Sequence, residues 1–212
     1  MLQMIQAIFA SPIWPSLALK GGTACYFLYG LERFSTDLDF DIIQENAKVD
    51  EILKQVLTKF GKNDGKQKIT LSYRADETKI KIDISRKIWK ANEYEEVSFF
   101  GKPIRLQTKA TIFANKLVAL LERMANRDLY DVYFFFQHLR DVNESVILER
   151  TGKSSKEVCG LILEQLQRLP KNYKILDGLG EALYDNKQKA WVKTHLLEAL
   201  KSMLLLQISD LK

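Results

Sequence analysis

Residues 17–43 constrain the fold of this chain most strongly, because a glycine pair stands between an apolar run and a strictly alternating segment. The short apolar run Leu17–Lys20 ends at Gly21-Gly22, and glycine allows tight backbone conformations that other residues avoid. Residues 23–31 have the pattern of a helix with an aromatic face. In residues 38–43 apolar and acidic side chains alternate, which is the period of a half-buried strand. The segment therefore predicts a strand, a tight turn, a helix and a second strand.

Three aspartates fall where strands can bring them together. Asp37 and Asp39 are two residues apart, so on a strand their side chains point to the same side. Asp83 lies on the polar face of another alternating segment, residues 78–86. If that segment pairs beside residues 38–43, Asp83 falls near Asp39; the alternation permits this pairing without proving it. Carboxylates are ligands that Mg²⁺ prefers, so the three aspartates predict a site for Mg²⁺ or Mn²⁺.

The residues around the glycine pair suit a phosphate-bearing ligand. Gly21 and Gly22 let the backbone approach a phosphate closely. Thr23 adds a hydroxyl donor and is placed to cap the following helix, whose first N–H groups favour anions. Arg33 and Ser35 come just before the aspartates, and Arg33 either contacts phosphate or organises its loop.

The predicted secondary structure changes near the middle of the chain. Its 212 residues suit one large domain or two small ones. Residues 1–105 mix helical and strand patterns, and residues 106–212 are helical almost throughout. We therefore predict an α+β protein in which a mixed or antiparallel sheet with flanking helices forms a first lobe, and a helical bundle forms a second. The predicted elements are helices at 48–60, 108–125, 128–139, 154–169 and 191–206, and a hairpin of strands 68–75 and 78–86.

Composition excludes several classes of protein. No apolar run approaches 18 residues, so a membrane span is not expected. The first 16 residues lack a basic segment typical of a signal peptide, which favours a cytoplasmic protein. Cys25 and Cys159 show no metal-binding spacing and are expected in the core. The net charge of +5 permits contact with RNA or nucleotide phosphates without requiring it.

The second half carries further charged candidates. Lys109, Lys116 and Arg123 are seven residues apart and share one face of a helix. This row of cations could hold a triphosphate, or it could be a solvated basic face. Asp128 and Asp131 also share a helix face, and we expect one of them to be functional. The pattern does not choose between them, because the helix dipole alone would favour Asp128 near a helix start.

These motifs resemble the minimal nucleotidyltransferases of the DNA polymerase β-like superfamily, and more closely the AbiEii/AbiGii abortive-infection toxins. The resemblance covers about residues 18–136. Its second motif is the stretch KLVALLERMANRDLYDVYFF, which contains Lys116, Arg127-Asp128 and Asp131. The first motif is carried by Gly21, Gly22, Thr23, Arg33, Ser35, Asp37 and Asp39, with Asp83 in KIKIDIS.

The resemblance implies an enzyme that binds a nucleoside triphosphate with a divalent metal ion and transfers a nucleotide to RNA, such as a tRNA 3′ end. It also implies a cognate antitoxin encoded nearby. The implied metal ligands are Asp37, Asp39 and Asp83. Lys116 and Asp131 join these three as implied catalytic residues. The implied nucleotide-binding residues are Gly21, Gly22, Thr23, Arg33, Ser35, Lys116 and Asp128.

Two alternatives remain open at this stage. The acceptor could be a protein hydroxyl or a small molecule such as an aminoglycoside, since those enzymes share the Gly-Gly and Asp-x-Asp pattern. The chain could instead be a nucleotide-binding regulator that has lost turnover. No local motif encodes which triphosphate is used.

Overall fold

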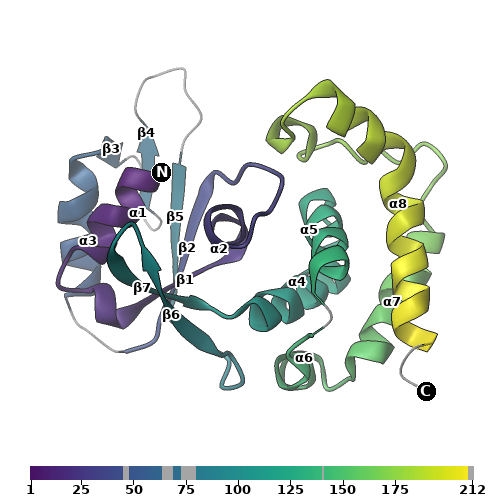
Figure 1. The fold of residues 1–212 in the computed structure, drawn as a ribbon, viewed down its shortest axis with the longest axis horizontal. Coiled ribbons are helices and arrows are strands. Elements are labelled where there is room, and N and C mark those ends of the chain that lie inside the picture. The colour runs from purple at the N-terminus through teal and green to yellow at the C-terminus, as the bar shows by residue number, and fades with distance from the viewer. Residues whose placement is uncertain (45–47, 64–68, 73–79, 140, 210–212) are drawn as a thin grey trace. The chain divides into compact units, whose positions relative to one another are not determined.

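The computed structural model describes residues 1–44, 48–63, 69–72, 80–139 and 141–209. Contacts within the chain divide it into two units (Figure 1). The core unit comprises residues 1–30, 35–88 and 92–108, and the helical unit comprises residues 31–34, 89–91 and 109–212. The chain therefore leaves the core unit for four residues just before the Asp-x-Asp strand and then returns to it.

The core unit is built on a mixed seven-stranded sheet with the order β3-β4-β5-β2-β1-β7-β6. The central strand β2 pairs antiparallel with β1 and parallel with β5. This arrangement confirms the predicted α+β class and its mixed sheet. The strands are β1 Leu17–Lys20, β2 Asp37–Ile42, β3 Lys62–Asn63, β4 Ile69–Ser72, β5 Ile80–Ser85, β6 Tyr94–Phe99 and β7 Lys102–Gln107.

The predicted hairpin of residues 68–86 is present as the antiparallel pair β4 and β5, with Ile69 opposite Ile82; residues 73–79 between them lie outside the described residues. A second hairpin, β6 and β7, was not predicted. Its turn places Phe100 at φ 49° and Gly101 at φ 75°, two successive left-handed residues as in a type I′ turn. The two-residue strand β3 pairs antiparallel with β4 and was not among the predicted elements.

Helices cover the apolar face of this sheet. Leu38, Phe40 and Ile42 are buried there, and the ring of Phe9 in α1 lies 6.1 Å from that of Phe40. Figure 1 shows α1 and α3 together on one side of the sheet and α2 on the other. The helices of the core unit are α1 Leu2–Phe9, α2 Gly21–Leu28 and α3 Val49–Thr58, with the short turn η1 Trp14–Ser16.

In its described residues, the helical unit packs five helices around a shared apolar core. Four were predicted; α6 was not, although Asn143 caps its start by accepting from Val146 N–H. Cys159 is buried in α7, as Cys25 is in α2. Among the described helices none is long and apolar enough to span a membrane; the cytoplasmic location stays a prediction. The elements are α4 Lys109–Arg123, α5 Asn126–His138, α6 Glu144–Thr151, α7 Ser155–Gln167, η2 Gly180–Ala182 and α8 Asn186–Ser209.

Candidate active site

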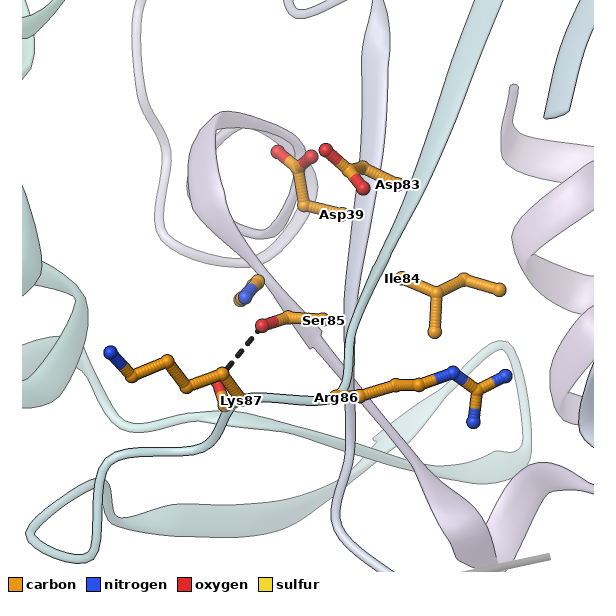
Figure 2. A pocket seen from close by; sticks show the side chains of 7 residues that line it. Asp39, Asp83, Ile84, Ser85, Arg86 and Lys87 are labelled. Atoms are coloured by element: carbon orange, nitrogen blue, oxygen red, sulfur yellow. Dashed lines mark hydrogen bonds between the residues drawn. The ribbon is translucent and has the colours of Figure 1, made fainter. Parts of the chain in front are cut away.

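Two carboxylates meet at the centre of the sheet. Asp39 on β2 and Asp83 on β5 are directly paired residues of neighbouring parallel strands, so their side chains leave the same face. Figure 2 shows the two carboxylates pointing toward one another. Both residues are half-buried. The predicted placement of Asp83 beside Asp39 is therefore confirmed.

Asp37 is not gathered with this pair. It shares a face with Asp39 and is half-buried, but two residues of a strand are about 6.6 Å apart along its axis. Among the described residues, no three His, Cys, Asp or Glu side chains converge closely enough to hold a metal ion. The three-aspartate cluster expected from the sequence is thus present as a pair with Asp37 further along the strand.

The glycine pair starts helix α2 instead of forming a separate turn before it. Gly21 has φ +71°, a left-handed conformation that favours glycine. A side-chain carbon at Gly21 would lie 2.7 Å from Asp39 Oδ2, so any other residue there would force the Asp39 carboxylate to turn or shift. Gly22 is buried directly behind it. The first turn of α2, where helix N–H groups and their dipole favour negative charge, is thereby set against Asp39.

Thr23 differs from its expected role as a helix cap. Because α2 begins at Gly21, Thr23 lies inside the first turn, and its side chain is fully buried. Its hydroxyl donates a hydrogen bond to the Asp37 carbonyl oxygen. In this structure the hydroxyl predicted to meet a nucleotide instead ties α2 to β2, the strand that carries Asp37 and Asp39.

The carboxylate pair opens into a cavity of about 430 Å³, a size typical of small-molecule sites. It brings together two acidic and three basic residues. The basic residues were missed as site candidates, although Lys20 directly precedes the glycine pair and Arg86-Lys87 directly follows β5. Figure 2 shows most of the lining and the hydrogen bond from Ser85 Oγ to the Lys87 carbonyl oxygen, 2.9 Å long. The lining residues are Lys20, Asp39, Asp83, Ile84, Ser85, Arg86 and Lys87.

A third acidic residue of β2, Asp41, is buried beside this cavity. It is 1% exposed, although its alternation with apolar residues predicted the same polar face as Asp39. Its Oδ1 lies 2.5 Å from Lys20 Nζ, and its Oδ2 accepts hydrogen bonds from Tyr94 Oη at 2.9 Å and Gln107 Nε2 at 2.7 Å. Burial, and then the charge of Asp41, raise the pKa of the Tyr94 phenol well above its usual range, so the phenol remains a donor.

Lys116, Asp128 and Asp131 of the second motif form an ion-pair network with Arg33 and Arg123 within the helical unit. The Arg33 guanidinium donates two hydrogen bonds, 2.6 and 2.7 Å long, to the Asp131 carboxylate, which is a strong bidentate geometry. Lys116 Nζ lies 2.7 Å from Asp131 Oδ2 and 2.9 Å from Asp128 Oδ1, and Arg123 completes the set at 2.6 Å from Asp128. Both aspartates are at most 1% exposed.

This network revises the reading of several sequence candidates. Arg33 is 3% exposed and donates hydrogen bonds to Asp131 and to the Phe34 carbonyl oxygen. Lys116 has its ammonium between two carboxylates, and neither Asp128 nor Asp131 is open to solvent. The nucleotide-binding and catalytic roles of these residues, and the role of half-buried Ser35, stay predictions.

The charges of the network determine its protonation. Burial raises the pKa of Asp131, but the charges of Lys116 and Arg33 outweigh it and hold that pKa below its ordinary value. Burial likewise lowers the pKa of Lys116, and the two carboxylates reverse this and raise it. Asp131 and Lys116 are therefore both charged at neutral pH, as a buried ion pair requires.

This chain, with two aspartates paired across neighbouring strands of a mixed sheet beside a helix begun by a glycine pair, is a nucleotidyltransferase by its match to a family model. The chain belongs to the AbiEii family: the family model described as nucleotidyl transferase AbiEii toxin, type IV toxin–antitoxin system, matches residues 4–195. The resemblance read from the motifs is confirmed. Membership implies a nucleotide substrate and a cognate antitoxin, and the family generally uses nucleoside triphosphates and divalent metal ions.

Solved structures share the fold at low sequence identity. A Helicobacter pylori protein provisionally described as a nucleotidyltransferase is 20% identical with a TM-score of 0.59, covering 99% of this chain and 95% of its own. The H. pylori protein JHP933 is 20% identical with a TM-score of 0.57, and the match covers 99% of this chain and 94% of JHP933. MenT4, a nucleotidyltransferase toxin of Mycobacterium tuberculosis, is 19% identical with a TM-score of 0.53, and the match covers 99% of this chain and 84% of MenT4. No curated protein matches this chain.

Proposed function

We propose that this protein is a metal-dependent toxin of a bacterial toxin–antitoxin system that transfers a nucleotide from a nucleoside triphosphate to an RNA hydroxyl, such as that of a tRNA 3′ end. The observation that carries the proposal is the direct pairing of Asp39 with Asp83 in a cavity that also presents Lys20, Arg86 and Lys87. Adjacent carboxylates and cations suit a polyphosphate accompanied by a divalent ion.

The residues present fit such an ion. Two neighbouring carboxylates repel each other unless a cation lies between or beside them, and Mg²⁺ is commonly bound by one or two carboxylates together with substrate phosphates. Asp39 and Asp83 would hold the ion, with Asp37 as the predicted third ligand. When bound, a divalent ion supplies charge neutralisation for the phosphate oxygens.

The transfer itself forms a bond between the acceptor oxygen and the α-phosphorus and breaks the bond from that phosphorus to pyrophosphate. The acceptor hydroxyl must lose a proton. Asp83 lies at the cavity wall and is the residue we assign to receive this proton or to complete the metal site. Gly21 and Gly22 begin α2 beside the Asp39 carboxylate, and the backbone N–H groups of this first helical turn can contact phosphate oxygens.

The test is label transfer by the intact protein. Each of the four labelled nucleoside triphosphates is incubated with the protein, Mg²⁺ or Mn²⁺, and total bacterial RNA. We expect labelled RNA from the wild type and at least about 100-fold less from Asp39→Asn and Asp83→Asn, because each removes a charge needed in the transition state. Asp141→Asn, which changes an exposed aspartate of the helical unit, is the matched control.

The acceptor is decided in the same assay by offering purified protein and aminoglycosides in place of RNA. Label on either of these, with none on RNA, would replace the RNA acceptor by one of the alternatives. Nucleoside triphosphate binding without any labelled product, for every acceptor, would identify a regulator that binds nucleotide and does not turn it over.

A further inference from the structure

We propose that Lys20 binds the triphosphate of the substrate and that Asp41 is the positioning residue that holds it in place. This inference rests on the proposed function only in taking the cavity beside Asp39 as the nucleotide site. Neither residue belongs to the motifs from which the site was predicted.

The sheet places Lys20 in line with the two site carboxylates. Strands β5, β2 and β1 are neighbours in that order, and Asp83 pairs with Asp39, which pairs in turn with Lys20. Directly paired residues point to the same face of a sheet. The row therefore runs from two carboxylates to one ammonium across three strands, and all three residues line the cavity.

A buried network fixes the ammonium of Lys20. Asp41 accepts from Lys20 through one carboxylate oxygen, and its other oxygen accepts from Tyr94 and Gln107. Gln107 is itself held, since Tyr29 Oη donates to its carbonyl oxygen at 2.8 Å. A lysine side chain loses considerable rotamer freedom when it is ordered. Because Asp41 has already ordered Lys20, binding an anion there need not supply that ordering free energy.

The ammonium retains the capacity to bind a ligand. Lysine carries three N–H donors, and Asp41 accepts from one of them. The Lys20 side chain is 25% exposed, whereas Asp41 is 1% exposed. The network is thus buried on the side of Asp41 and open on the side of Lys20, toward the cavity.

Lys116 and Arg86 are less suited to this task. Lys116, the cation predicted from the sequence to balance the triphosphate, lies within 2.9 Å of both Asp128 and Asp131. Arg86 lines the cavity but is 61% exposed and lies 2.5 Å from Asp50, so water screens much of its charge. Lys20 is held by a buried carboxylate, so an anionic chain lying beside Asp39 finds an ordered cation there, and the chemistry that fits it is a polyphosphate.

Binding of inorganic tripolyphosphate to the intact protein, followed by calorimetry, tests the role of Lys20 independently of turnover. We expect Lys20→Met to raise Kd about 10- to 100-fold, as loss of a charge-assisted hydrogen bond does, and Lys20→Arg to stay within about threefold of wild type. The matched control is Lys102→Met, at an exposed lysine of β7. Unchanged affinity in folded Lys20→Met would overturn the proposal, whether or not the protein transfers nucleotides.

The positioning role of Asp41 is tested with Asp41→Asn and Tyr94→Phe. We expect Asp41→Asn to raise KM for the triphosphate more than it lowers kcat, and Tyr94→Phe to do the same more weakly because it removes one hydroxyl. The tripolyphosphate Kd of both variants should rise in the same order. If both variants only lower the unfolding temperature while Kd and KM stay at the wild-type values, Asp41 is a structural residue and the positioning role is wrong.

Discussion

Gly21 lies so close to Asp39 that a single added carbon on the glycine would come within 2.7 Å of a carboxylate oxygen. Real side-chain carbons do not reach such distances, so a residue other than glycine would displace the Asp39 carboxylate from this position. The left-handed backbone conformation of Gly21, with φ +71°, is a second reason why glycine is favoured at this position. The glycine pair therefore acts in this structure through the position of Asp39 as well as through access to a phosphate.

Gly21→Ala is expected to destabilise the protein by about 1–3 kcal/mol, from the left-handed conformation and the contact together, and to reduce transfer by displacing Asp39. Urea unfolding and label transfer measure the two effects. Gly101→Ala is the control, since Gly101 has φ +75° with nothing within 4 Å of the added carbon. If both variants lose equal activity, the contact with Asp39 is not what matters.

Divalent ions are expected to stabilise the wild type through Asp39 and Asp83. Asp83→Asn removes one of the two carboxylates that would hold the ion. A ligand that binds only the folded state raises stability, by about 2.7 kcal/mol at one hundred times its Kd. Mg²⁺ or Mn²⁺ should therefore raise the unfolding temperature of the wild type and leave that of Asp83→Asn nearly unchanged.

Asp37→Asn provides the comparison within the same strand. Because Asp37 is not clustered with the other two aspartates, its variant should retain more of the metal-induced stabilisation than Asp39→Asn. Equal loss in the two variants would show that Asp37 is a full ligand, as the motif predicts. Thermal unfolding with and without metal gives the answer for each variant.

The carboxylate pair could be predicted because strand alternation fixes the face on which a side chain lies. Once Asp39 and Asp83 each occupy the polar face of a strand, only the pairing of the strands remains open. That pairing joins β2 to β5, which are about forty residues apart, and it is parallel. No local pattern encodes such a contact, so the sequence could permit it without fixing it.

Other parts of the site depend on tertiary contacts that the alternation of polar and apolar residues does not predict. Asp41 follows the same alternation as Asp39, yet it is buried by Tyr94 and Gln107 from the hairpin β6 and β7, which was not predicted. Without that hairpin, Asp41 and its partner Lys20 appear to be solvated residues. Similarly, Arg33 and its partner Asp131 are 98 residues apart in the sequence. Because no local pattern predicts a contact over that distance, the sequence left two roles open for Arg33.

The buried network of the helical unit should make stability depend on acid pH. Asp131 has a folded pKa below its ordinary value of 3.8, so its charge stabilises the fold above that value, and the contribution is lost as pH falls through the lowered pKa. Asp131→Asn leaves Arg33 and Lys116 without this carboxylate and should destabilise the protein by about 3–5 kcal/mol at pH 7. Urea unfolding at pH 7 and below pH 4 should show the difference from wild type shrinking in acid.

An ion pair on the surface serves as a control that distinguishes the loss of a buried charge from the loss of an exposed one. Glu198 lies 2.8 Å from Lys201 but is 76% exposed, so Glu198→Gln should change stability by less than about 1 kcal/mol. A similarly small change in Asp131→Asn would contradict the structural role of the network.

Lys116→Met is expected to destabilise the protein by about 3–5 kcal/mol, because it leaves two buried carboxylates, Asp128 and Asp131, without their shared cation. A loss below about 1 kcal/mol would mean that the ion pairs in this structure do not hold in solution. Transfer measured well below the unfolding temperature then separates the two roles of Lys116. An unchanged KM for the triphosphate would limit it to the ion-pair network, whereas a KM raised about tenfold in the folded variant would support the triphosphate contact that the second motif implies.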